Sequence, residues 1–343
     1  MNLTSALHDR NSPISRFVRF VGTMADGARR GEPFAQLPRQ VLGLEAMPSK
    51  PVVEPVLGAN AGTVGTAFDY RMRYHLANAD SSTFLARHAI PTLSGRDPGG
   101  MVGCQLDWFF ANLDELVTRL SPAGRRLDDA DEALLCRYCI VLAYFEAVYR
   151  SGPGGWRPTL PPPAAQRAAP ESEGLLTLAP EPAVKDMTNL SRSAETTFAP
   201  FIGLAASGRV TCRLNPRFAG SVDIPADADF VLGDLLFDLK TTKTLDAKAV
   251  REAVLQLIAY VLLDYDDEYH IRQIGLYAAR HEWVICWPLW EFVLPPASVL
   301  RLHSAGIEPD AAQVDSRLAK LRALMKLVVT DHEIDYGTDF SDD

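Results

Sequence analysis

Hydrophobic residues recur every three or four positions in several segments of the chain, a spacing that places them on one face of an α-helix. This pattern predicts helices at 14–25, 64–78, 108–120, 128–149 and 184–198 in the first part of the chain. Two more are predicted in the second part, at 247–263 and 311–329. The first half of the protein is therefore expected to be mainly helical.

The pattern changes after residue 208, where short runs of β-branched, aromatic and aliphatic residues are typical of strands. The predicted strands cover 210–214, 228–232, 235–240, 271–279 and 283–288. One long helix separates the third predicted strand from the fourth. We therefore predict an α/β protein with a helical N-terminal half.

A stretch rich in proline, glycine and alanine, 151–183, lies between these two parts. Such a composition is typical of an exposed loop or a linker, and its length is unusual within a compact domain. We expect a mainly helical region over 1–150, a linker or loop over 151–183 and an α/β core over 184–330. The acidic tail follows at 331–343.

The composition narrows the class of protein. Of the 343 residues, 47% are hydrophobic and 22% are charged, values that favour a core-forming soluble chain over a disordered or fibrous one. No run of about 18 uncharged apolar residues occurs, and Asp9 and Arg10 interrupt any N-terminal signal segment, so we expect no membrane partner. The five cysteines are too few for a disulfide framework, which favours a cytoplasmic location.

Candidate chemistry lies in a predicted hairpin. Two apolar runs flank Gly233-Asp234, a two-residue loop with glycine in its first position. A loop of this length makes Leu232 face Leu235 and so fixes the register of the whole hairpin. Because side chains alternate between the two faces of a strand, this register brings four polar residues onto one face. They are Asp227, Asp229, Asp238 and Lys240.

In this register Asp229 lies opposite Asp238, and Asp227 lies opposite Lys240. Two facing carboxylates in an otherwise apolar sheet repel each other and resist desolvation. A divalent cation such as Mg²⁺ or Mn²⁺ would resolve this conflict, because both prefer carboxylate oxygens. A lysine ammonium beside them could orient a water or stabilise charge on a phosphate oxygen. A metal and a lysine together favour phosphodiester hydrolysis.

The next predicted helix adds two polar residues. Thr244 or Asp246 can cap its first turn. Gln256 and Tyr260 are four positions apart, so they share one face of the helix and could bond to a phosphate or to a water.

These residues resemble a known signature. Asp229 followed by Asp238-Leu-Lys240 is similar to the D…(D/E)xK motif of the PD-(D/E)XK nuclease superfamily. Gln256 and Tyr260 resemble the QxxxY motif that follows it in the RecB-like branch. The resemblance covers about 205–290 well. It implies a mixed central sheet flanked by helices and the cleavage or processing of DNA with Mg²⁺ or Mn²⁺.

The same nucleases carry Gly-x-x-x-His on an early helix, with the histidine near the metal. This chain has Gly65-Thr-Ala-Phe-Asp69, so an aspartate stands at the histidine position. The resemblance implies that the region 1–150 contributes the first helix of the nuclease core. Asp69 is then a third candidate metal ligand.

The expected function is a metal-dependent deoxyribonuclease that hydrolyses phosphodiester bonds, in DNA repair or in defence against foreign DNA. The candidate catalytic residues are Asp229, Asp238, Lys240, Gln256 and Tyr260. The candidate metal ligands are Asp229, Asp238, Asp69 and Asp227, and either Asp227 or Asp229 could be the main ligand of the pair. The candidate contacts to DNA are Arg280, Arg71 and Arg73.

Two alternatives remain at this point. A non-catalytic protein of the same fold could bind DNA or a partner protein through this surface. A hydrolase could use the same carboxylates on a small phosphate ester. A metal ion bound between Asp229 and Asp238 would argue against the non-catalytic protein. Nucleotide turnover without DNA cleavage would favour the hydrolase of small phosphate esters.

The net charge of −9 first argues against a DNA substrate. The tail 331–343, however, holds six carboxylates and no lysine or arginine, and so carries −6 of that charge. The rest of the chain is close to neutral, and a bound Mg²⁺ would offset two more charges. The charge is therefore compatible with an enzyme that binds DNA at one metal-loaded cleft.

Overall fold

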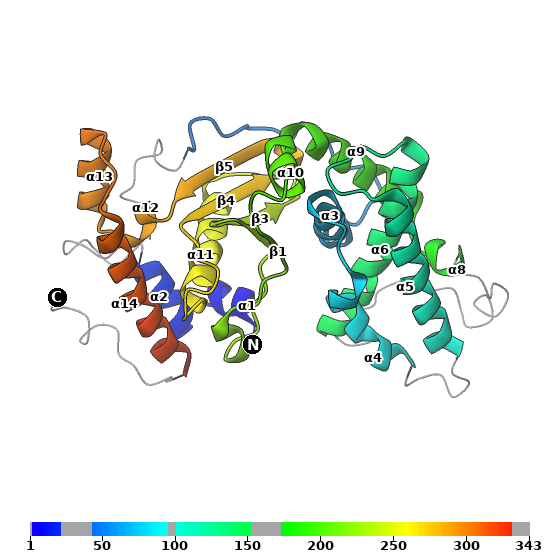
Figure 1. Cartoon of the computed structure of the whole chain (residues 1–343), viewed down its shortest axis with the longest axis horizontal. Helices are drawn as coiled ribbons and strands as arrows, with labels where there is room; N and C mark the ends of the chain where they lie inside the picture. The colour runs from blue at the N-terminus through cyan, green and yellow to red at the C-terminus, as the bar shows by residue number, and fades with distance from the viewer. Residues whose placement is uncertain (1, 22–42, 95–100, 152–172, 331–343) are drawn as a thin grey trace.

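The computed structural model describes residues 2–21, 43–94, 101–151 and 173–330 (Figure 1). The N-terminal half is helical, as predicted. Its α-helices are α1 Leu3–His8, α2 Pro13–Val21, α3 Ala61–Leu76, α4 Ile90–Ser94, α5 Met101–Leu120, α6 Asp129–Ser151, α8 Glu173–Leu176, α9 Glu181–Thr197 and α10 Ala199–Ala206. Short 3₁₀ turns, η1 Ser81–Thr83 and η2 Leu85–Ala89, join α3 to α4.

The C-terminal half contains a five-stranded mixed sheet with the order β1-β2-β3-β4-β5. Its strands are β1 Cys212–Leu214, β2 Phe230–Leu232, β3 Leu235–Lys240, β4 Gln273–Ala278 and β5 Trp283–Pro288. Only β3 and β4 pair in parallel, and α11, Ala247–Leu263, connects them. The remaining elements are η3 Ala219–Val222, η4 Ala279–His281, α12 Trp290–Val293, α13 Pro296–Ala305 and α14 Ala311–Thr330.

The β2–β3 hairpin has the predicted register. Leu232 pairs with Leu235, and Phe230 pairs with Phe237. Gly233 has a φ of +64°, a conformation that glycine adopts without the steric cost of a Cβ atom. The two-residue loop therefore sets the register that positions the polar residues at the open end of the hairpin.

The sheet lies between two layers of helices (Figure 1). On one face, Leu236 and Leu276 pack in a core with α11, α2 and α14. On the other face, Phe237 and Tyr277 pack in a core with α3, α6 and α9. The helical half and the sheet thus share a core, which fixes the position of α3 relative to β3.

Aromatic rings form much of the contact between the helical half and the sheet. Phe198, between α9 and α10, lies 5.1 Å from Phe237 and 4.7 Å from Tyr277, measured between ring centroids. Gly275 of β4 makes room for this cluster, since a Cβ atom there would lie 2.5 Å from the Phe237 ring. Overpacking of this kind is destabilising, so Gly275 is required by packing rather than by a turn.

Most predicted elements agree with the structure, and three of them, β3, β5 and α11, have the predicted bounds. Asp246, one of the two candidate caps, begins α11 by accepting a hydrogen bond from the backbone N–H of Ala249 (2.8 Å). The described part of the predicted linker 151–183 contains the end of α6, all of α8 and the start of α9, with a turn over 177–180 between the last two. Its residues 152–172, the predicted tail 331–343 and the end of the predicted helix 14–25 lie outside the described residues. The proposed division into domains stays a prediction.

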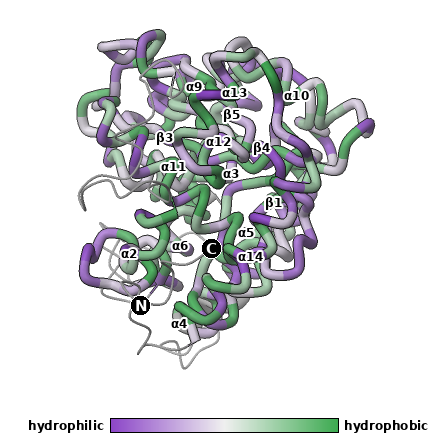
Figure 2. Tube along the Cα trace, turned by 90° about the vertical axis from the view of Figure 1, so that its left-hand side faces the viewer, coloured by the Kyte–Doolittle hydropathy of each residue, from purple (hydrophilic) through white to green (hydrophobic). Residues whose placement is uncertain are grey.

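Hydrophobic and hydrophilic residues are interleaved along the described part of the trace (Figure 2). Within the described ranges, no helix has the length and apolar character needed to cross a bilayer.

Candidate active site

The centre of the site is the C-terminal end of β3. Asp238 and Lys240 are two positions apart and therefore point to the same face, toward α11. The Lys240 Nζ atom lies 2.9 Å from Oδ1 and 2.8 Å from Oδ2 of Asp238. Asp238 is only 4% exposed, so this ion pair holds a charge that burial would otherwise make costly.

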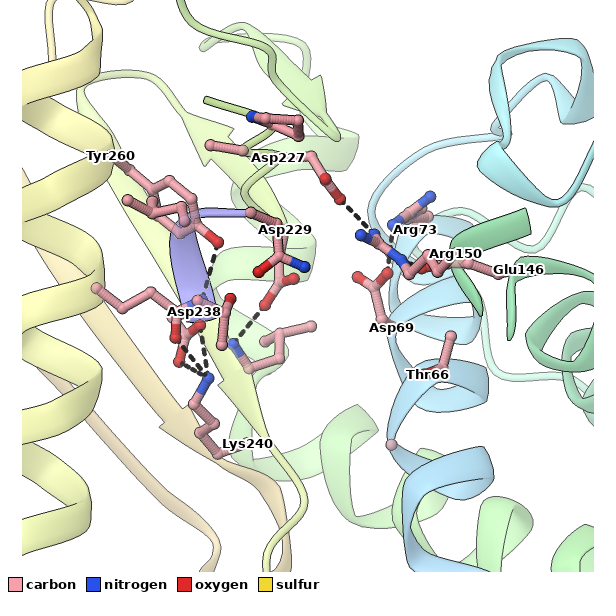
Figure 3. A pocket seen from close by; sticks show the side chains of 18 residues that line it. Thr66, Asp69, Arg73, Glu146, Arg150, Asp227, Asp229, Asp238, Lys240 and Tyr260 are labelled. Atoms are coloured by element: carbon pink, nitrogen blue, oxygen red, sulfur yellow. Dashed lines mark hydrogen bonds and ion pairs between the residues drawn. The ribbon is translucent and has the colours of Figure 1, made fainter. Parts of the chain in front are cut away.

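Asp229 lies at the adjoining end of the hairpin, one residue before β2. Its Oδ2 atom accepts a hydrogen bond of 2.6 Å from the backbone N–H of Leu239. The carboxylate is thus fixed against β3, on the same face as Asp238 (Figure 3). The two carboxylates line one pocket, and the register that predicts their facing holds as far as the Phe230–Phe237 pair.

Asp227 is not placed as predicted. The paired residues of the hairpin end at Phe230, and Asp227 bonds to Arg150 of α6 instead of facing Lys240 (Figure 3). The Leu239 N–H donates to the side chain of Asp229 (2.6 Å), so the β2–β3 ladder does not continue to Asp227. Asp227 nevertheless lines the same pocket.

The helix α11 completes this side of the pocket. Gln256 accepts a hydrogen bond from Lys240 Nζ through Oε1 (3.2 Å) and donates from Nε2 to the Tyr260 hydroxyl (2.8 Å). The four-residue spacing inferred from the sequence therefore joins both side chains to Lys240. Asp238, Lys240, Gln256 and Tyr260 form one continuous chain of contacts.

The opposite wall comes from the helical half. Asp69 of α3 lines the pocket and is ion-paired with Arg73, one turn later. Its second oxygen, Oδ1, is buried and has no hydrogen-bond partner in the part of the chain that the structure describes. Asp69 thus keeps an acceptor in the wall of the pocket, and its role as a metal ligand stays a prediction.

Two charged residues of the pocket had not been predicted, Glu146 and Arg150 of α6. Arg150 bonds through Nε to Glu146 (2.7 Å) and through Nη2 to Asp227 (2.8 Å). The Tyr70 hydroxyl donates a hydrogen bond of 2.6 Å to the other oxygen of Glu146. The spacing of Glu146 and Arg150, four positions apart on a predicted helix, signals an ion pair, but nothing in the sequence places that pair beside the hairpin.

Two of the three predicted DNA contacts must be corrected. The Arg71 side chain is fully buried and bonds to both oxygens of Glu132 (2.8 and 2.7 Å). Arg280 is 1% exposed and bonds to both oxygens of Asp186 (2.9 and 2.7 Å). Because each guanidinium is enclosed with a buried carboxylate, neither reaches a phosphate. Of the three, Arg73 alone lines the pocket.

The pocket has a volume of about 300 Å³ and lies between the sheet and the helical half. Five carboxylates and three cations line it, an excess of two negative charges when all are ionised. The carboxylates are Asp69, Glu146, Asp227, Asp229 and Asp238, and the cations are Arg73, Arg150 and Lys240. Each cation is paired with a carboxylate, whereas among the described residues Asp229 bonds only to the backbone N–H of Leu239.

Burial and mutual repulsion shift the pKa values of these groups. Burial raises the pKa of Asp229 well above its ordinary value, and Asp69 and Asp238 raise it further. Burial also raises the pKa of Asp69 to about 6, although Arg73 opposes this shift. Burial alone would lower the pKa of Lys240, but Asp238 and Asp229 outweigh it and raise that pKa. The site therefore favours a bound cation, and Lys240 keeps its proton at neutral pH.

The donor set fits a hard divalent ion in its chemistry, since carboxylate oxygens dominate and two negative charges are in excess. Within the described ranges, however, no three acidic, histidine or cysteine side chains converge as ligands. Two of these carboxylates are in ion pairs, Asp238 with Lys240 and Asp69 with Arg73. Asp229, Asp238 and Asp69 could hold Mg²⁺ or Mn²⁺ after these pairs rearrange.

Comparisons with models of known protein families, with curated proteins and with solved structures gave no match for this chain. The case for function therefore rests on the residues and geometry of the pocket.

Proposed function

We propose that this pocket is the active site of a metal-dependent deoxyribonuclease related to the RecB-like branch of the PD-(D/E)XK superfamily. One observation carries the proposal. The separate pieces of the D…DxK and QxxxY signatures, together with Asp69 from α3, line a single pocket. These positions span much of the chain, so a chance match of short motifs gives no reason for them to meet.

In this proposal Asp229, Asp238 and Asp69 hold Mg²⁺ or Mn²⁺. The cation supplies charge neutralisation and Lewis-acid activation of a phosphate oxygen. Its binding also removes the repulsion that raises the pKa values of these carboxylates. Asp227 becomes a ligand only if it leaves Arg150, so Asp229 is the main ligand of the pair.

Lys240 acts as a cation and a hydrogen-bond donor. Asp238 and Asp229 raise its pKa, so that without a metal it is an ammonium at neutral pH, the form that donates hydrogen bonds. It can orient the attacking water or stabilise negative charge that develops on the phosphate. Gln256 and Tyr260 hold Lys240 from the α11 side and are positioning residues for it.

The test is a cleavage assay with purified protein on linear and circular DNA, single- and double-stranded, in Mg²⁺ or Mn²⁺. Wild type is expected to cut at least one substrate. Lys240→Ala is expected to lower the rate by about 10²- to 10³-fold, the loss typical of one electrostatic contact to the transition state. Lys248→Ala is the matched control, because Lys248 lies on α11 with its side chain 76% exposed. Equal rates for wild type and Lys240→Ala would refute the assigned role.

A second candidate function is a non-catalytic protein that binds DNA or a partner through this pocket. This second function is favoured by the ion pair between Lys240 and Asp238, because Asp238, a proposed metal ligand, is already bound to the lysine. The discriminating measurement is Mn²⁺ binding by calorimetry, since a non-catalytic protein of this kind needs no ion there.

Nucleotide turnover without DNA cleavage would instead indicate a hydrolase of small phosphate esters. Cytoplasmic location remains a prediction from the sequence.

A further inference from the structure

The two walls of the pocket differ in charge. The sheet side holds Asp227, Asp229, Asp238 and Lys240, an excess of two negative charges, whereas on the helical side Arg73 and Arg150 balance Asp69 and Glu146 (Figure 3). A single ion pair, Arg150 to Asp227, crosses from one wall to the other. The proposed metal ligands come from both walls, Asp229 and Asp238 from the sheet side and Asp69 from the helical side, and they leave Arg150 without a function.

Arg150 is held firmly at one end and loosely at the other. Its Nε atom bonds to Glu146, which is 6% exposed and fixed in turn by the Tyr70 hydroxyl. Its Nη2 atom bonds to Asp227, whose side chain is 23% exposed and lies on the loop before β2. The Arg150 side chain itself is 42% exposed. The buried Glu146 therefore orients the guanidinium, while its outer end faces a partner that a ligand can replace.

Arg73 adds a second charge beside it. This side chain is 3% exposed, and its Nε and Nη1 atoms have no hydrogen-bond acceptor in the described part of the chain. Its guanidinium lies 4.7 Å from the centre of the Tyr70 ring, which holds it in place. Arg73, paired with Asp69, is thus a fixed guanidinium on the same wall as Arg150.

An ionised phosphate diester has the same charge as the Asp227 carboxylate and similar acceptor oxygens. Arginine binds both groups through the planar fork of its guanidinium. We propose that Arg150 binds a phosphate of the DNA strand and that Asp227 occupies this position until the strand enters. This inference rests on the proposed function, since it assigns the substrate contact opposite the metal ligands. Asp227 is then a competitor of the substrate.

Competition gives the inference a distinctive signature. Removing the arginine deletes the phosphate contact, whereas neutralising Asp227 deletes its competitor. The two substitutions are therefore expected to change DNA binding in opposite directions. If the ion pair only stabilised the fold, both substitutions would break it and would weaken binding together.

The experiment measures fluorescence polarisation of a fluorescein-labelled single-stranded oligonucleotide at low salt in EDTA, so that no cleavage occurs. Arg150→Gln is expected to raise Kd about tenfold, the value of one charge-assisted hydrogen bond to phosphate. Asp227→Asn is expected to lower Kd about threefold, because repulsion and competition are both removed. Thermal melting of each variant checks that it is folded.

The control pair is Arg119 and Asp131, another arginine–aspartate ion pair on the helical half that does not line the pocket. Arg119→Gln and Asp131→Asn carry the same charge changes and are expected to leave Kd nearly unchanged. Weaker binding by both Arg150→Gln and Asp227→Asn would overturn the inference. An unchanged Kd in both variants would also overturn it, as would a wild-type protein that does not bind the oligonucleotide.

Failure of this inference is distinguishable from failure of the proposed function. If wild type cleaves DNA and Lys240→Ala does not, but Arg150→Gln binds normally, only the role of Arg150 is wrong. If the opposite shifts in Kd occur but wild type does not cleave DNA, the phosphate contact of Arg150 is supported and the proposed nuclease activity is wrong.

Discussion

Gly65 of α3 lies directly against Thr241, the residue that follows β3. A Cβ atom built on Gly65 would lie 3.1 Å from Thr241 Oγ1, closer than an ordinary van der Waals contact. The glycine therefore lets α3 approach the end of β3, one turn before Asp69. The four-residue spacing has a structural reason. Gly65 allows α3 to pack against the end of β3, and Asp69, one turn later, lines the pocket.

Enlarging Gly65 should push α3 away from β3 and withdraw Asp69. Gly65→Val is expected to lower stability by about 1–3 kcal/mol through overpacking and to weaken Mn²⁺ binding. Gly62→Val is the control on the same helix, because a Cβ atom there meets only Asn60 Oδ1 at 3.5 Å. Thermal melting and calorimetry with Mn²⁺ measure the two effects. Equal metal affinity in both variants would show that the close approach does not position Asp69.

The α11 pair should act on catalysis through Lys240. Gln256→Ala removes the acceptor that holds Lys240, so we expect kcat to fall about tenfold, in line with the loss of one positioning contact. KM should change little. Tyr260→Phe keeps the ring stacked on Phe218 and removes only the acceptor for Gln256, so a smaller loss is expected. A rise in KM without a change in kcat would instead place Gln256 in contact with the DNA.

Glu291 of α12 should make stability depend on pH. Burial raises its pKa to about 7, and its Oε2 atom has no hydrogen-bond partner within the described ranges, although Oε1 lies 2.9 Å from His303 Nε2. Because the folded-state pKa lies above the unfolded value, this group favours the fold at low pH. That stability is lost as the pH rises through about 7.

Glu291→Gln removes the charge that is costly above this range. The variant is expected to gain melting temperature relative to wild type at about pH 8, and much less at about pH 5. Glu308→Gln, at an exposed position, is the control and should shift melting equally at both values. A larger gain at the lower pH would contradict the sign of this effect.

The sequence predicted the hairpin and its acidic residues because both depend on local rules. A two-residue loop with glycine fixes the register, and the register fixes the face on which Asp229 and Asp238 lie. The spacing of Gln256 and Tyr260 places both on one face of α11 in the same way. These features depend on residues near one another in the chain, so periodicity was sufficient to find them.

The features that the sequence did not predict all depend on contacts distant in the chain. Arg150 and Asp227 are 77 positions apart, and no local pattern joins them. Arg71 and Arg280 were expected to bind DNA, but their buried partners lie 61 and 94 positions away. A charged side chain looks the same in sequence whether it faces solvent or a buried carboxylate. Only the packing of α3, α6 and α9 distinguishes the two.

The central claim is that the carboxylates of this pocket support metal-dependent DNA cleavage, and Asp238→Asn tests it most directly. The substitution keeps the shape of the side chain and removes one proposed ligand charge. Initial rates of DNA cleavage in Mn²⁺ should fall by about 10²-fold or more relative to wild type, and EDTA should abolish the activity of wild type. Cleavage by Asp238→Asn at the wild-type rate, or wild-type cleavage that persists in EDTA, would contradict the account.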